Sequence, residues 1–308
     1  MSSSKYFDPK KSLKLFGHKD NFNFLKNLLI NHKLPQILLL SGEKGIGKST
    51  LINHLMFYFY DNKNYNQSDN SLINESKFYK NFILNLYPNL IYLNGESFQK
   101  IKVEDIRKLK DDILKTPLNN QKRFIILDDI DLFNINSLNG LLKILEEPNK
   151  NNYFILIDNL SKPLLETIKS RCHEIKIMLN SMSRNEIIKE LVKKFNQKIV
   201  FDQNILKTTP GNYIKYNYIF EKNKINLKDG YLINLDILLS VFKKEKDIFY
   251  KDLMIFFTEY YLKKMKNEKI YNYEKYIEKR SFLIKHINNF FWYNTNQKSL
   301  IRYLENKF

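Results

Sequence analysis

One nine-residue segment constrains the fold of this 308-residue chain more than any other. It reads GEKGIGKST at positions 42–50 and fits G-x-x-x-x-G-K-[ST], the pattern of a phosphate-binding loop, or P-loop. An apolar run at positions 36–41 precedes it and predicts a buried strand, and apolar residues follow at helical spacing over positions 51–56. Because the pattern lies between a strand and a helix, it predicts a nucleotide site more strongly than an ordinary glycine-rich turn.

Each part of the P-loop has a predicted role. Its glycines let backbone N–H groups approach phosphate oxygens, and the helix that begins near Lys48 directs its positive end at the same anion. Lys48 is expected to reach the terminal phosphates and the Ser49 hydroxyl to bind Mg²⁺. The predicted nucleotide-binding residues are Gly42, Glu43, Lys44, Gly45, Ile46, Gly47, Lys48, Ser49 and Thr50.

The Mg²⁺ ion of such a site also needs an acidic side chain. The apolar run at positions 123–127 ends in Asp128 and Asp129, and ligands of open α/β sheets bind at the carboxyl ends of strands. We therefore expect Asp128 to bind the magnesium shell and Asp129 to orient the attacking water. The alternative is a pair of acids that only ends a strand at the surface.

Composition limits what else can be inferred. The net charge of +18 suggests a polyanionic partner, but only six of the 51 basic residues are arginine and the chain has no alanine. This pattern is typical of AT-rich codon usage, so the charge permits nucleic-acid binding and hardly argues for it.

The single cysteine, Cys172, excludes a disulfide framework and a multi-cysteine zinc site. No apolar run reaches transmembrane length and the N-terminus lacks an apolar signal core, so we expect a cytoplasmic protein.

The hydrophobic pattern predicts two kinds of architecture. Predicted strands at 36–41, 89–93, 123–128, 153–157 and 174–177, most of them apolar, alternate with helical patterns, including one at 101–114. This alternation indicates a parallel five-stranded sheet covered on both faces. The polar segment 61–80 is predicted to be a loop or a surface insertion. After position 178 helices dominate: Ser183 is expected to cap the first, Pro210 and Gly211 to form a turn, and long amphipathic helices to follow from about 226.

Further motifs resemble one known family. LFGH at 15–18, the acids Asp128 and Asp129, LNGLLKILEEP at 138–148 and TIKSRC at 167–172 occur in that order. Together they resemble the AAA+ clamp-loader subunits of bacterial DNA polymerase III, and neither LLKxLEEP nor SRC follows from fold physics. The strand entry at 88–90, the helix at 103–107 and the Thr116-Pro117 turn are most similar to the delta-prime branch of this family.

The resemblance implies an assembly and a division into domains. Residues 1–177 would form the AAA+ nucleotide-binding domain, 178–225 a helical lid and 226–308 a helical collar that holds five subunits together. ATP and Mg²⁺ would be the cofactors, and the gamma/tau and delta subunits would be partners in placing a sliding clamp on primed DNA. By position, Arg171 corresponds to an arginine finger that reaches a neighbouring ATP site, and Asn159 to the polar sensor.

Departures from the family pattern modify this expectation. Many relatives carry four zinc-binding cysteines that are absent from this sequence, so we expect no zinc. Asp129 stands where hydrolysing subunits have Glu, and Ile214 stands where they have a sensor Arg, with Lys215 a weak substitute. These differences predict a chain that binds nucleotide but hydrolyses it slowly.

Three other readings remain open. The chain could be the ATP-hydrolysing gamma/tau motor subunit of the same loader, although it lacks that subunit's zinc module and lid arginine. It could be a stand-alone P-loop enzyme such as a nucleotide kinase, for which a helical collar has no use. It could also be a simple nucleic-acid-binding protein, which would rest on lysine content alone.

Overall fold

The structure, a computed structural model, describes residues 7–95, 103–293 and 295–307. The chain divides into two compact units, and each is described separately. The P-loop unit contains residues 7–187 together with the short segment Thr209–Gly211, and the helical unit contains residues 188–208 and those from 212 onward. The expected domain limits at 177 and 225 stay predictions.

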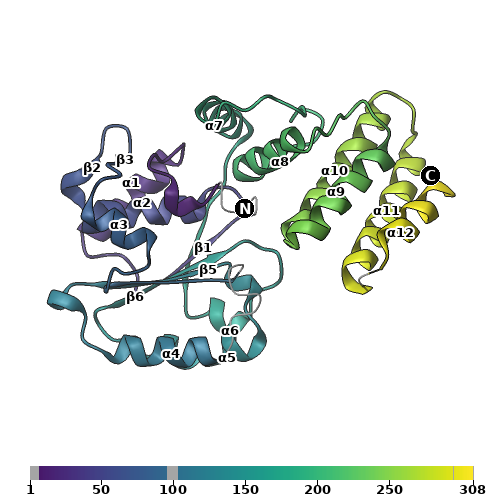
Figure 1. Cartoon of the computed structure of the whole chain (residues 1–308). Helices are drawn as coiled ribbons and strands as arrows, with labels where there is room; N and C mark the ends of the chain where they lie inside the picture. Colours follow the sequence, from purple (N-terminus) through teal and green to yellow (C-terminus); the bar gives the residue numbers. More distant parts are fainter. Residues whose placement is uncertain (1–6, 96–102, 294, 308) are drawn as a thin grey trace. The chain divides into compact units, whose positions relative to one another are not determined.

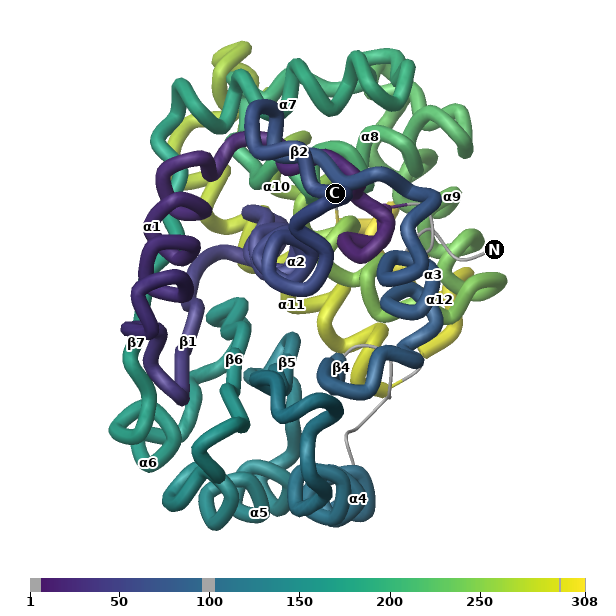
Figure 2. Tube along the Cα trace, turned by 90° about the vertical axis from the view of Figure 1, so that its left-hand side faces the viewer, coloured from purple at the N-terminus to yellow at the C-terminus, as the bar shows by residue number. Residues whose placement is uncertain are grey.

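A parallel sheet forms the centre of the P-loop unit. Its five strands lie in the order β4 (Leu90–Asn94), β5 (Arg123–Asp128), β6 (Asn152–Asp158), β1 (Ile37–Ser41) and β7 (His173–Lys176). Figure 2 shows these strands side by side. All four pairings are parallel, and Ser41 at the end of β1 lies opposite Asp158 and Lys176. The predicted parallel five-stranded sheet is confirmed.

Helices cover both faces of this sheet, as Figure 1 shows. One face carries α1 (Lys19–Ile30), α2 (Lys48–Tyr60) and α3 (Lys77–Ile83). The other carries α4 (Val103–Leu114), α5 (Ile135–Glu146) and α6 (Glu166–Lys169). Because side chains alternate along a strand, Leu38 and Leu40 enter the first core while Ile37 and Leu39 enter the second. Both faces of the central strands β1, β5 and β6 are therefore mostly buried, which explains the apolar runs of these strands in the sequence.

The segment 61–80 is not the plain loop that the sequence predicts. It contains a 3-10 helix, η3 (Asn62–Asn64), a small antiparallel pair, β2 (Tyr65–Asn66) and β3 (Ser71–Leu72), and the start of α3. Tyr65, Leu72 and Phe78 are buried in the first core. The polar residues between them hid these single apolar anchors, because strands of two residues are too short to show a period.

Further short elements connect the main ones. The predicted helix at 101–114 begins at Val103 within the described residues, and positions 101–102 lie outside them. Further 3-10 helices in the described part of the unit are η2 (Pro9–Lys11), η4 (Leu118–Asn120) and η5 (Ile130–Leu132).

The helical unit follows as the hydrophobic pattern predicts. Its helices are α8 (Pro210–Lys222, from Asn212 onward), α9 (Tyr231–Glu245), α10 (Phe249–Asn267), α11 (Tyr273–Tyr293) and α12 (Gln297–Glu305), and α7 (Ser181–Lys194) crosses into it. Phe201 is buried against rings from two helices, with ring centroids 4.6 Å from Tyr213 and 5.0 Å from Phe256. Aromatic packing of this kind makes the stripes bundle core.

One predicted helix cap and one predicted turn are wrong. Ser183 lies inside α7, and the cap is Asn180, whose Oδ1 accepts a hydrogen bond of 2.8 Å from the Ser183 N–H. Pro210 and Gly211 open α8 and do not form a separate turn. A proline at the first helical position loses no hydrogen bond, because that N–H has no partner within a helix.

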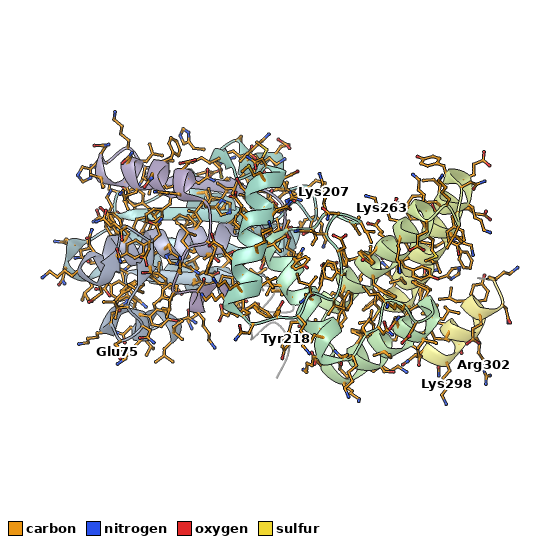
Figure 3. All side chains as sticks on the ribbon, turned by 90° about the horizontal axis from the view of Figure 1, so that it is seen from above. Glu75, Lys207, Tyr218, Lys263, Lys298 and Arg302 are labelled. Atoms are coloured by element: carbon orange, nitrogen blue, oxygen red, sulfur yellow. The ribbon has the colours of Figure 1, made fainter. Side chains whose placement is uncertain are left out.

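Basic side chains lie mainly at the surface. Figure 3 shows Lys298 and Arg302 projecting outward from α12, and both are exposed. Among the described residues, no helix is long and apolar enough to span a membrane.

Candidate functional site

The P-loop leaves the carboxyl end of β1 and turns directly into α2. Gly42 N–H donates to the Asp158 carbonyl of β6 at 3.2 Å, which ties the start of the loop to the sheet. Gly47 has φ 109°, a conformation that favours glycine, and a Cβ there would lie 3.1 Å from His18 Nε2. Since α2 begins at Lys48, the N–H groups of its first turn face this loop. The backbone thus forms a cradle that fits a phosphate group.

Three loop carbonyls are held from outside the cradle. The Thr209 hydroxyl donates to Lys44 O at 2.7 Å, Gly211 N–H donates to Gly45 O at 2.9 Å, and His18 Nε2 lies 2.6 Å from Ile46 O. The C=O and N–H groups of a trans peptide point in opposite directions. These hydrogen bonds therefore direct the N–H group of each following residue to the side of the loop opposite the three carbonyls. Burial lowers the pKa of His18. Because a carbonyl oxygen can only accept, Nε2 is the donor of this hydrogen bond. The LFGH motif therefore supports the loop.

Lys48 holds its ammonium group inside the loop. Its side chain is buried, and Nζ donates to the carbonyls of Gly42 at 2.7 Å and Glu43 at 2.9 Å. Burial lowers the pKa of Lys48 to about 8, although nearby carboxylates, led by that of Asp128, oppose the shift. An anion in the cradle would give this ammonium group a stronger partner than two neutral carbonyls.

Ser49 and Asp128 meet as predicted for a magnesium site. Ser49 Oγ donates to Asp128 Oδ1 at 3.0 Å, and the Asp129 N–H reaches the same oxygen at 3.1 Å. The other oxygen, Oδ2, accepts a hydrogen bond from the hydroxyl of Tyr92 on β4. Burial raises the pKa of Asp128, and the bonds from Tyr92 and Ser49 oppose the shift. A hydroxyl and a carboxylate are oxygen donors of the kind that Mg²⁺ takes, so these residues fit the ion.

The predicted catalytic acid and sensor also lie together. Asn159, which follows β6, donates through Nδ2 to Asp129 Oδ1. Asp131 was missed by sequence reasoning, yet its carboxylate accepts from the N–H groups of Asn159 at 3.2 Å and Ser161 at 2.9 Å. It thereby fixes the backbone on which the sensor stands. The only sequence signal was a third acid two residues after Asp129.

Two other loop residues have their own neighbours. The Glu43 side chain pairs with Arg184 of α7 at 3.2 Å, and Thr50 lies in the first turn of α2.

In the helical unit Ile214 is buried, and the ammonium of Lys215 lies 5.5 Å from the centre of the Phe249 ring. The two positions that would replace a lid arginine are therefore used in packing.

Arg171 is not part of this cluster. It precedes β7, which runs parallel to β1, whereas the P-loop follows β1. Arg171 therefore lies at the amino ends of the strands and the P-loop at their carboxyl ends. Its guanidinium bonds the Thr167 carbonyl and Glu146 Oε1, each at 2.7 Å, and about a third of the side chain is exposed.

Comparison with known proteins places this arrangement in a family. A family model described as "DNA polymerase III, delta subunit" matches residues 17–181, more than half of the chain. The chain belongs to this family. The match spans the whole P-loop unit apart from its ends, and the parallel sheet with helical segments after it agrees with the AAA+ fold class predicted from the motifs.

Individual relatives are similar over parts of their length. The DNA polymerase III subunit gamma of Buchnera aphidicola subsp. Schizaphis graminum is 28% identical over 72% of this chain and 62% of its own. The delta' subunit of Pseudomonas aeruginosa is 30% identical over 44% of this chain and 40% of its own. A solved structure of a gamma subunit-related protein from Thermotoga maritima aligns over 91% of this chain and 96% of its own, with 14% identity and a TM-score of 0.49. The chain thus spans less than two thirds of either curated relative.

Proposed function

We propose that this chain is a clamp-loader subunit of bacterial DNA polymerase III, of the delta-prime kind, that binds ATP and Mg²⁺ at its P-loop. The observation that carries the proposal is the group of Lys48, Ser49, Asp128, Asp129 and Asn159 at the carboxyl ends of the strands. Within this group Lys48 and the loop amides would hold the phosphates, and Ser49 and Asp128 the metal ion. The bound Mg²⁺ would neutralise charge on the phosphates.

Slow hydrolysis is the second part of the proposal. Asp129 has a shorter side chain than the Glu expected of a hydrolysing subunit, and its carboxylate already accepts a hydrogen bond from Asn159. The buried Ile214 offers no charge to a phosphate group. A water molecule would be poorly oriented and the developing charge weakly compensated, so the chain would mostly hold its nucleotide.

Arg171 is the third part. Because it lies at the opposite end of the sheet from its own P-loop, we propose that it serves the ATP site of a neighbouring subunit. A guanidinium fork on the transition-state phosphate is worth about 10³–10⁵ in rate in comparable systems. The partners would be the gamma/tau and delta subunits, with the sliding clamp and primed DNA reached through the complex in the cytoplasm. The lid and collar limits at 178–225 and 226–308 belong to the same proposal.

A gamma/tau motor role is the second candidate. The gamma subunit match, which covers 72% of this chain, favours it over enzymes of another kind. The two roles differ in stoichiometry and in hydrolysis. A motor subunit would be present in several copies and would turn over ATP, whereas the proposed subunit would be present once.

The test combines binding and mass measurements. The purified chain should bind a fluorescent ATP analogue in the presence of Mg²⁺, and Lys48→Ala should abolish this binding. The complex isolated through a tag on this chain should contain one copy of it by native mass spectrometry, beside several copies of another AAA+ subunit. Several copies in one ring, or fast hydrolysis by the chain alone, would favour the motor role. A chain without partners would contradict both.

A further inference from the structure

The carboxylate of Asp128 has its two oxygens committed to different neighbours. Oδ1 accepts hydrogen bonds from Ser49 Oγ and the Asp129 N–H, so it is the oxygen on the P-loop side that could bind a metal ion. Oδ2 accepts a hydrogen bond from the hydroxyl of Tyr92. Tyr92 belongs to neither the P-loop nor the acidic pair, and comes from the neighbouring strand β4, where it lies opposite Ile126 in register. Ile126 and Asp128 are two residues apart on β5, so Tyr92 and Asp128 share one face of the sheet.

The ring of Tyr92 is itself fixed from the other side. The ammonium group of Lys10, in η2, lies 3.7 Å from the centre of the Tyr92 ring, at the distance of a cation–π contact. Lys10 Nζ also donates to Asn85 Oδ1 at 2.6 Å, which gives the ammonium group a second partner. These contacts form a chain from Lys10 through the Tyr92 ring to Asp128. A tyrosine that only filled space in the core would not need a polar partner at its hydroxyl and a cation at its ring.

We propose that Tyr92 is a positioning residue of the magnesium site, which holds Asp128 Oδ2 so that Oδ1 stays turned toward Ser49. This inference rests on the proposed nucleotide site. The terminal torsion of an aspartate is broad, so an unrestrained carboxylate would sample orientations that do not present an oxygen to the ion. Hydrogen-bond partners of metal ligands typically contribute about 10–100-fold in metal affinity. Lys10 acts one step further out, by keeping the Tyr92 ring in place.

The experiment removes one hydroxyl and measures the magnesium requirement. In Tyr92→Phe the ring and its contact with Lys10 remain, and only the bond to Asp128 is lost. Binding of a fluorescent ATP analogue is measured in EDTA and over a Mg²⁺ titration. We expect the half-saturating Mg²⁺ concentration to rise about tenfold, while the affinity in EDTA stays within about twofold because the phosphate contacts are intact. Lys10→Met should shift the Mg²⁺ requirement in the same direction by a smaller factor.

A matched control is available in the same unit. Tyr60 is half-buried, like Tyr92, and its hydroxyl donates to the carbonyls of Asn89 and Lys122, each at 2.8 Å, outside the magnesium site. Tyr60→Phe should leave both the Mg²⁺ requirement and the EDTA affinity unchanged. An unchanged Mg²⁺ requirement in Tyr92→Phe, or an equal loss of affinity in EDTA, overturns the role of Tyr92. If the unaltered chain binds no nucleotide at all, the proposed site fails as well, which separates the two failures.

Discussion

At the scale of single residues, the ammonium group of Lys48 is a buried charge inside the P-loop. Its two carbonyl partners satisfy hydrogen bonds but carry no negative charge, so the cost of removing the charge from water is only partly offset. The lowered pKa of Lys48, about 8, reports that remaining cost. A phosphate group bound in the loop would place a further negative charge beside this ammonium group, so the loop should favour anions.

This predicts a pH dependence of nucleotide binding. Phosphate stabilises the charged form of Lys48, so the pKa of this lysine rises on binding, and above pH 8 a proton must be taken up. Affinity should be level below pH 8 and fall by up to about tenfold per pH unit above it. Lys48→Arg stays charged throughout this range, so it should bind with a flat profile, whatever its absolute affinity. Isothermal titration between pH 7 and 10 checks this. A level profile for the unaltered chain would contradict the pKa assigned to Lys48.

At the scale of elements, the sequence predicts long apolar segments well and short or capped ones poorly. The central strands β1, β5 and β6 show as apolar runs because residues on both of their faces are buried, whereas β7 is mostly exposed. The hairpin of β2 and β3 gave no such signal, since two residues cannot display a period. Helix starts depend on a single side chain, so a Ser with a suitable Glu downstream was as plausible a cap as Asn180.

The candidate site was predictable to a similar extent. The P-loop pattern and the two acids predict the site from residue type and spacing. In the structure Ser49 contacts Asp128, and Asn159 contacts Asp129. Tyr92 and Thr209 could not be found in this way. Each lies far in sequence from its partner and acts through one hydroxyl, and only the folded chain brings them to Asp128 and Lys44.

The capping of α7 gives a prediction at this scale. Asn180→Ala removes the acceptor of the Ser183 N–H and should destabilise the first turn of α7 by about 1 kcal/mol. Amide hydrogen exchange in that turn should accelerate about fivefold in consequence. Ser183→Ala is the matched control, because a serine inside a helix can be replaced by alanine without loss. Equal effects of the two substitutions would restore Ser183 as the cap.

At the scale of the whole molecule, the two ends of the sheet carry different groups. The carboxyl ends gather the groups proposed to hold nucleotide, and the amino ends present Arg171. Glu146 pairs with Arg171, and an ion pair this exposed contributes little to stability. The guanidinium can therefore exchange Glu146 for another anion at small cost.

The prediction for Arg171 concerns the assembled complex. In single-turnover hydrolysis by the complex, one kinetic phase would belong to the ATP site that Arg171 serves. With Arg171→Ala, the rate of this phase should fall by about 10³-fold or more. Arg171→Lys should not restore it, since an ammonium lacks the planar fork. Glu146→Gln removes only the ion pair and should leave that phase intact. Nucleotide binding by the isolated Arg171→Ala chain should be unchanged, and a loss there would contradict a role in trans.

The bond between Gly211 and the P-loop has a consequence for mutational surveys. Its donor is a main-chain N–H, and a Cβ on Gly211 would lie 2.8 Å from the Gly45 oxygen that accepts it. Alanine scanning cannot delete this donor; it can only add a methyl group where there is no room. A survey that replaces side chains one at a time would record an intolerant position and miss the hydrogen bond behind it. Replacing the amide by an ester at this position would remove the donor alone.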